Sequence, residues 1–212
     1  MVRIAVFDSG LGSLSIIKAL QKISKLEIIY FADQNSYPYG NKSQTQLSKI
    51  IQNSIQLLEE RFSPDIIVIA SNIPSLMLNI TTKKIIGVKP PLIEAKKKFK
   101  TKRIGILATK SAINSHGLNK HIQKNNFSKS FKIFKINGSK LVELVESGKF
   151  ISNKKHCQKI IKKTLDEKLS KNNIDTLTLS STHLSFLKPL LKNQYPKINF
   201  IDPVNLVVEK II

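Results

Sequence analysis

The sequence has one cysteine and no long apolar run, and each of these shortages excludes a class of protein. Its one cysteine cannot form an intrachain disulfide, and its four histidines are scattered, so we expect no metal site. No apolar run approaches the roughly 18 residues that a membrane helix needs. The opening segment MVRIAVFDSG is typical of a strand and lacks the basic flank and apolar core of a signal peptide, which predicts a cytoplasmic protein.

The one cysteine, Cys157, shares a helical stripe with Ile161, Leu165 and Leu169, which follow at four-residue spacing. A small apolar side chain on such a stripe is more often part of a core than a reactive thiol. We therefore interpret Cys157 as a core residue.

Arginine is also scarce, with three arginines beside 32 lysines in a chain of formal net charge +21. Proteins that read nucleic acids rely on the arginine fork to contact phosphates and guanine, and no known nucleic-acid module is recognisable in the sequence. We therefore expect nonspecific attraction to polyanions. A dedicated lysine-rich nucleic-acid-binding module is kept as an alternative.

Short apolar runs rich in isoleucine and valine are abundant, and segments long enough for a crossover helix separate them. The runs are Ile4–Phe7, Glu27–Phe31, Asp65–Ala70, Lys84–Val88, Arg103–Ala108, Phe131–Ile136, Asp175–Leu179 and Ile198–Ile201. Nearly continuous runs of this kind are typical of parallel strands buried on both faces. Their alternation with segments such as Ser43–Arg61 and Ser152–Leu169 predicts an α/β fold of doubly wound parallel sheets.

A boundary between two similar halves is indicated near residues 88–102. Pro90 and Pro91 interrupt the chain there, and the basic stretch AKKKFKTKR follows, which we expect to be solvated. The predicted domains are residues 1–95 and 96–201. Ligands of such sheets bind beyond the carboxyl ends of strands, so the turns DSG, ASN, ATK and SSTH are the candidate site.

The turn VFDSGLGSLS follows the first predicted strand, and its two glycines allow a tight turn with free amide donors at a helix start. A dinucleotide site with Asp33 as its acidic partner is the rival interpretation. However, Ser15 stands at the third glycine position, and Asp8 would repel a pyrophosphate. A carboxylate at a strand end better suits an ammonium group. The structural alternative is that Asp8 and Ser9 only cap the helix.

Three further segments carry polar residues after apolar runs. IIYFADQNSYPYGNKS contains a Pro-Tyr-Gly loop that suits a pocket wall, although an ordinary turn has the same composition. DIIVIASNIPS and DTLTLSSTHLSFL each place a serine, then an amide or a hydroxyl, just past a buried strand. These two turns are predicted to face one another across a cleft.

Taken in order, these segments resemble the motifs of the glutamate racemase family, part of the broader aspartate/glutamate racemase group. VFDSGLGSLSIIKAL resembles the family's opening motif, YFADQNSYPYGNKS its second, and IVIASNIPS the turn that carries its first catalytic cysteine. IGILATKSAINS resembles the start of the second half, LVELVESG a short internal helix, and DTLTLSSTHLSFLKPL the turn with the second cysteine. The resemblance covers nearly the whole chain.

The resemblance implies two α/β domains with the site in the cleft between them, and a C-terminal helix at 202–212 that returns to the first domain. It implies cofactor-independent racemisation of glutamate by two opposed thiols, and often a homodimer. It also implies that Asp8 and Ser9 serve the amino-group side of the substrate and the nearby acid/base chemistry. The further site residues that it implies are Pro38, Tyr39, Gly40, Asn72, Thr182 and His183.

The sequence departs from the family pattern at the chemistry itself. Ser71 and Ser181 occupy the two cysteine positions. Ile73, Ala112 and Leu184 replace a threonine, a polar residue and an aromatic residue of the pattern. Because these three changes alter the same pocket, we interpret the serines as natural divergence.

Serine preserves the shape of a cysteine site but not its acidity. A hydroxyl about five pKa units weaker than a thiol raises the barrier to forming the base by roughly 7 kcal/mol, or about 10⁵ in rate. An adjacent base can activate a serine. His183 is the candidate base for Ser181, and Asp8 is the candidate for Ser71.

These observations predict a family member that binds a small amino acid or dicarboxylate such as glutamate, without a cofactor, and racemises it poorly. One alternative is an active glutamate or aspartate racemase that uses the serines at 71 and 181 or other side chains. The other is the lysine-rich nucleic-acid-binding module on a racemase scaffold.

Overall fold

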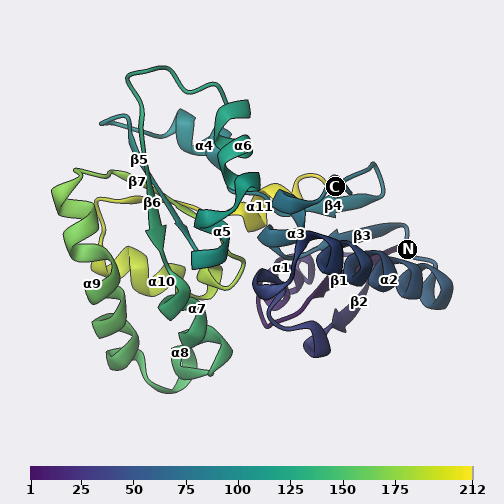
Figure 1. Cartoon of the computed structure of the whole chain (residues 1–212). Coiled ribbons are helices and arrows are strands. Elements are labelled where there is room, and N and C mark those ends of the chain that lie inside the picture. Colours follow the sequence, from purple (N-terminus) through teal and green to yellow (C-terminus); the bar gives the residue numbers. More distant parts are fainter. Residues whose placement is uncertain (212) are drawn as a thin grey trace.

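Each Ile/Val-rich run forms a strand, and the strands build two parallel sheets in the computed structural model, which describes residues 1–211 (Figure 1). The first sheet contains β1 (Val2–Asp8), β2 (Leu26–Ala32), β3 (Ile66–Ile69) and β4 (Ile85–Gly87) in the order β2-β1-β3-β4. The second contains β5 (Arg103–Ala108), β6 (Lys132–Asn137), β7 (Thr176–Leu179) and β8 (Asn199–Ile201) in the order β6-β5-β7-β8. The sheets share one topology, so the predicted pair of similar α/β halves is confirmed.

Helices connect the strands in both halves. Those beside the first sheet are α1 (Ser13–Leu20), α2 (Gln44–Phe62), α3 (Asn72–Met77) and the C-terminal α11 (Pro203–Val208), with short 3₁₀ turns at Gln34–Ser36 and Tyr39–Asn41. Those of the second half are α4 (Leu92–Lys97), α5 (Lys110–Asn114), α6 (His116–Lys124), α7 (Ser139–Glu146), α8 (Lys149–Ser152), α9 (Lys154–Lys171) and α10 (Leu184–Gln194).

The first sheet is covered on both faces because side chains alternate along a strand. Ile4 and Val6 of β1 pack with α1 and with α11, whereas Ala5 and Phe7 pack with α2. α11 therefore lies against the first sheet although it follows the last strand of the second, as the yellow helix in Figure 1 shows.

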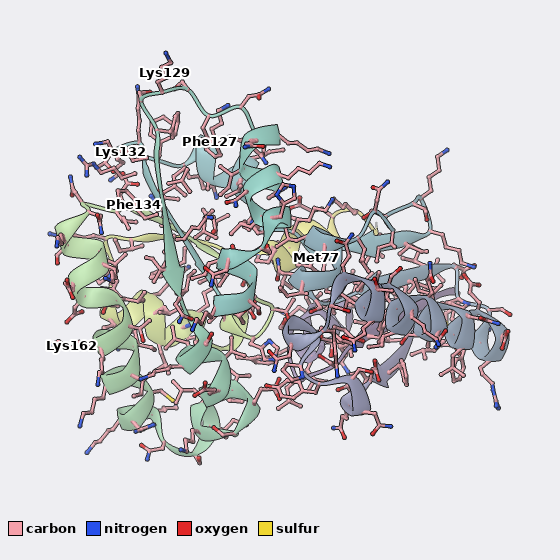
Figure 2. All side chains as sticks on the ribbon, viewed as in Figure 1. Met77, Phe127, Lys129, Lys132, Phe134 and Lys162 are labelled. Carbon is pink, nitrogen blue, oxygen red and sulfur yellow. The ribbon has the colours of Figure 1, made fainter. Side chains whose placement is uncertain are left out.

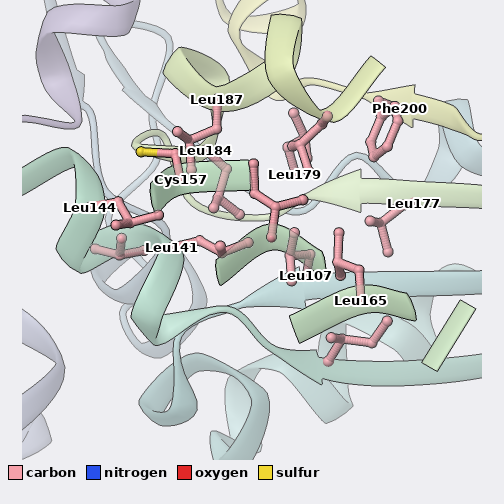
Figure 3. Close-up of a cluster of buried hydrophobic side chains, with 14 of the residues drawn as sticks. Leu107, Leu141, Leu144, Cys157, Leu165, Leu177, Leu179, Leu184, Leu187 and Phe200 are labelled. Atoms are coloured by element: carbon pink, nitrogen blue, oxygen red, sulfur yellow. The ribbon is translucent and has the colours of Figure 1, made fainter. Parts of the chain in front are cut away.

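The second sheet has its larger core on the face covered by α7, α9 and α10. Cys157 is fully buried there with Ile161, Leu165 and Leu169 of α9, among the leucines of β5, β7 and α10 (Figure 3). Its interpretation as a core residue is confirmed. The other face, with Ile104 and Ile106 of β5, is covered by α4, α5 and α6.

Local signals in the sequence fix the ends of the two long helices. Ser43 caps α2 in a reciprocal capping box with Gln46, and Ser63 ends the helix in a left-handed conformation. Asn153 caps α9 by accepting a hydrogen bond from the amide of His156.

The basic stretch after the double proline is only partly solvated, which corrects its prediction. α4 includes its first residues, and Ala95 is fully buried beneath them, because one face of this short helix closes over β5. Lys129, Lys132 and Lys162 of the second half extend into solvent (Figure 2). In residues 1–211 no helix is long and apolar enough to cross a membrane. Residue 212, the last of the predicted C-terminal helix, lies outside the described residues.

Candidate active site between the two sheets

A cavity of about 520 Å³ lies where the carboxyl ends of β1 and β3 face those of β5 and β7. Strand ends of a parallel sheet present turns and helix starts at a common edge, where side chains and free amides meet. All ten predicted site residues line this cavity: Asp8, Ser9, Pro38, Tyr39, Gly40, Ser71, Asn72, Ser181, Thr182 and His183. The structure brings them together, and their chemical roles stay predictions.

Asp8 is the last residue of β1 and is almost fully buried. Burial raises the pKa of its carboxyl from 3.8 to about 6, although the charge of His183, the amide of Ser9 and the hydroxyl of Ser71 oppose the rise. The Ser9 amide donates to Asp8 Oδ1 at 2.7 Å. The N-cap residue of α1 is Gly12 and no side chain caps the helix, so Asp8 and Ser9 do not act as its caps.

Asn72 opens α3 directly after Ser71 and is 5% exposed. Neither its amide nitrogen nor its amide oxygen has a hydrogen-bond partner within the described part of the chain. A buried amide without partners costs about 1–3 kcal/mol for each unsatisfied group, so such a residue is typical of a site that a ligand completes.

The Pro-Tyr-Gly loop forms one wall of the cavity. Tyr39 is buried, and its hydroxyl donates to Asp33 Oδ2 at 3.0 Å. Burial, followed by the charge of Asp33, raises the pKa of Tyr39 above its ordinary value. Asp33 therefore supports the loop from behind and does not line the cavity as the dinucleotide interpretation requires.

A chain of hydrogen bonds begins in the turn after β7. Ser181 Oγ lies 3.3 Å from His183 Nδ1, and His183 Nε2 contacts Glu146 Oε1 at the end of α7. The amide of Leu11, in the turn after β1, donates to the same Glu146 oxygen at 2.9 Å. Burial alone would raise the pKa of Glu146, but the bond and charge of His183 and the Leu11 amide together hold it below its ordinary value.

The two halves meet closely at this chain of bonds. The Thr182 hydroxyl donates to the carbonyl oxygen of Ala70 at 3.1 Å, which joins the turn after β7 to the turn after β3. A Cβ atom on Gly10 would collide with the Glu146 carboxylate, and one on Gly12 would lie 2.6 Å from His183 Nδ1. The two glycines are therefore needed for close approach of the first turn to the second half.

Curated relatives share this chain nearly end to end. The sequence is 34% identical to the glutamate racemase of Sulfurihydrogenibium sp. (strain YO3AOP1), over 97% of this chain and 80% of that protein. It is 35% identical to the glutamate racemase of Buchnera aphidicola subsp. Acyrthosiphon pisum (strain APS), over 97% of this chain and 81% of that protein. The chain belongs to the glutamate racemase family. No family model matches it.

Solved glutamate racemases have the same fold. The Escherichia coli enzyme, in complex with L-glutamate and an activator, gives a TM-score of 0.84 at 23% identity, over 99% of this chain and 80% of that one. The Francisella tularensis enzyme, in complex with D-glutamate, gives a TM-score of 0.79 at 24% identity, over 99% of this chain and 79% of that one. The Campylobacter jejuni enzyme gives a TM-score of 0.76 at 27% identity, over 98% of this chain and 84% of that one. The predicted racemase-like architecture is therefore confirmed.

The residues that depart from the glutamate racemase pattern fall in two places. Ile73 and Ala112 line the cavity and make its wall less polar. Leu184 is fully buried in the core of the second half, so its replacement of an aromatic residue changes packing behind His183.

Glu146 is a candidate functional residue that the sequence reasoning missed. It lies within LVELVESG, a segment already matched to the glutamate racemase family, and its position in that motif was the available signal. Lys110 and Ser111, at the start of α5, also line the cavity. Within residues 1–211 no group of three or more histidine, cysteine or acidic side chains has the arrangement to hold a metal ion.

Proposed function

We propose that this glutamate racemase homologue binds a glutamate-like amino acid in the cleft and catalyses two-base racemisation slowly or not at all. The observation that supports this proposal most is that one cavity at the strand ends is lined by Asp8, the unpartnered Asn72 and the two serines. Relatives with the same fold bind L-glutamate and D-glutamate in solved complexes, which supports the ligand class.

The polar groups of the cavity suit an amino acid. The Asp8 carboxylate, ionised above about pH 6, provides a counter-charge for an ammonium group. The Asn72 amide offers a donor and an acceptor, and Lys110 at the cavity edge offers a cation for a carboxylate. These groups recognise the two ends of a dicarboxylic amino acid.

The serines argue against efficient racemisation. Ser71 and Ser181 both line the cavity, at the positions where the resemblance to the family expects its two thiols. Each hydroxyl is a much weaker acid than a thiol, by about 7 kcal/mol in the cost of forming the base. Ser181 has an imidazole beside it, which supports the second candidate, a racemase with residual activity.

Binding and α-proton exchange test the two parts separately. Calorimetry with L-glutamate and D-glutamate is expected to show binding that weakens at least about tenfold in Asp8→Asn, because the counter-charge is lost. Glu167→Gln, an exposed carboxylate on α9, is the matched control and is expected to bind normally. Absence of binding by the folded wild-type protein would overturn the ligand assignment.

The unaltered protein is then incubated in deuterated water with L- and D-glutamate and L- and D-aspartate, and the α-proton is followed by NMR. We expect exchange far below ordinary enzymatic rates. Exchange at an enzymatic rate would show that the site racemises its ligand with bases other than thiols, and would support the second candidate.

A further inference from the structure

Ser181 and His183 line the cavity, and Glu146, which does not line it, completes a linear relay with them. Ser181 and His183 are each 8% exposed, and the hydroxyl, the imidazole and the carboxylate follow one another through hydrogen bonds. The relay joins two elements, because Glu146 ends α7 while the serine and the histidine lie in the turn after β7.

The carboxylate fixes which imidazole nitrogen carries the proton. Glu146 accepts a hydrogen bond from Leu11, and its depressed pKa keeps it ionised, so its oxygen accepts from His183 Nε2. When the ring is neutral, it presents the lone pair of Nδ1 to Ser181 Oγ, 3.3 Å away. This is the arrangement that a base needs to take the proton of a serine, with a third group orienting the base.

We propose that Ser181 is a nucleophile activated by His183 and oriented by Glu146, and that the protein hydrolyses esters of a small carboxylic acid through an acyl-serine intermediate. The chemistry is acyl transfer, which is distinct from racemisation. It relies on the proposed function only for the acyl group, expected to be glutamate-like.

The steps balance without an oxidant or a cofactor. Ser181 Oγ forms a bond to the ester carbonyl carbon, its proton passes to His183 Nδ1, and the bond to the alcohol oxygen breaks as the alcohol takes that proton. Water then attacks the acyl-serine, His183 takes a proton from the water, and the proton returns to Ser181 as the carboxylic acid leaves. The unpartnered Asn72 amide lies in the same cavity and provides a donor for the oxygen that becomes negative.

Ser71 and Ser180 provide contrasts within the same cavity. Ser71 has the Asp8 carboxylate as its polar neighbour in place of an imidazole. Ser180 Oγ is 2.9 Å from the hydroxyl of Thr178 and makes no hydrogen bond to His183. Neither serine is hydrogen-bonded to an imidazole among residues 1–211, so the relay predicts reaction at Ser181 alone.

A fluorophosphonate probe tests the nucleophile directly, since it reacts with activated serines and needs no knowledge of the substrate. The full-length protein is labelled at pH 8, and the adduct is located by peptide mass spectrometry. We expect one adduct, on Ser181, which is absent in Ser181→Ala and in His183→Gln and is retained in Ser180→Ala. No adduct on folded wild-type protein, or equal labelling of Ser181→Ala, would overturn the proposal.

Glu146 is a positioning residue, and its test compares two substitutions by their rates of labelling. Glu146→Gln is expected to slow labelling by up to about 10⁴-fold, the effect of changing the carboxylate of a catalytic triad to an amide that favours the wrong imidazole tautomer. Glu146→Asp keeps a carboxylate and is expected to recover part of the lost rate. Labelling of Glu146→Gln at the wild-type rate would remove Glu146 from the relay.

Protection by glutamate separates this proposal from the proposed function. Excess L-glutamate is expected to slow labelling of Ser181 if the ligand occupies the cavity. If labelling proceeds unchanged, the glutamate-binding proposal fails while the activated serine stands. If calorimetry shows that glutamate binds but the probe never labels Ser181, the activated-serine proposal fails while the glutamate-binding proposal stands.

Discussion

At the scale of single residues, Asp8 has a strongly unfavourable environment for its charge. Burial raises its pKa from 3.8 to about 6, so the folded chain binds more protons than the unfolded chain between these values. The stability associated with protonated Asp8 is present below about pH 4 and is lost as the pH rises through 6. The cleft thus keeps an ionised carboxylate at neutral pH at a cost of about 3 kcal/mol, roughly 1.4 for each pKa unit.

Asp8→Asn is expected to remove the loss of stability that the wild type shows as Asp8 ionises. The free energy of unfolding of the variant, relative to the wild type, should rise by about 3 kcal/mol between pH 3 and pH 7. Urea denaturation at several pH values measures the difference. The exposed Glu167→Gln is the control, and a pH-independent difference for Asp8→Asn would contradict the burial of an ionised carboxylate.

The two serines permit a second test at this scale. Ser71→Cys and Ser181→Cys each restore a thiol where the resemblance to the family places one. Because each thiol removes the proton from one face, each single variant is expected to exchange the α-proton of one enantiomer of glutamate, and the double variant that of both. NMR in deuterated water measures gains of up to about 10⁵ per site. No gain in a folded double variant would show that more than the thiols has been lost.

At the scale of elements, the turn between β1 and α1 determines how closely the halves approach. Its glycines lie against Thr182, His183 and Glu146, where no side chain fits. The turn also supplies the Leu11 amide that holds Glu146. One short segment of the first half therefore orients the relay of the second half.

Gly12→Ala is expected to push this turn away from His183. Overpacking of this kind costs about 1–3 kcal/mol of stability and should weaken glutamate binding as the cleft shifts. Gly148→Ala is the matched control, because it has open space around it and a positive φ of 70°, so it is expected to cost about 1 kcal/mol and leave binding unchanged. Thermal unfolding and calorimetry measure both variants.

At the scale of the whole molecule, the chain crosses between its halves twice. α4 follows the first sheet and covers the second, and α11 follows the second sheet and packs on α1. The domains at residues 1–95 with 202–212 and at 96–201 stay a prediction, and Leu92 and Ala95 of α4 pack with the second sheet. The homodimer and the cytoplasmic location stay predictions.

Val204 and Val207 of α11 are buried against the first sheet. Their joint replacement by alanine is expected to lower the free energy of unfolding by about 3 kcal/mol through lost burial and cavity formation. Asn205→Ala, an exposed site on the same helix, should change it little. An unaffected double variant would show that α11 adds little to the stability of the first half.

The charge of +21 is a property of the whole surface. We expect duplex DNA to bind weakly at about 25 mM salt and to be lost by about 200 mM, because phosphate contacts release counterions. Fluorescence anisotropy measures the salt dependence. Undetectable or salt-insensitive binding would contradict the polyanion prediction.

The sequence by itself determined the strands, the long helices and the polar turns, because these depend on local patterns of apolar residues, caps and glycines. It also identified the edge at which the site residues would meet, because parallel strands end together. The caps at Ser43 and Asn153 and the buried face of α9 are of this local kind.

The tertiary structure alone decided the pairings on which the chemistry depends. Glu146 contacts His183, which is 37 residues away in the sequence, and Leu11, which is 135 residues away. Thr182 is hydrogen-bonded to Ala70, 112 residues away. The partial burial of α4 in the basic stretch likewise depends on β5 arriving beneath it. Contacts of this range leave no local pattern in the sequence, because the packing of one half on the other brings their partners together.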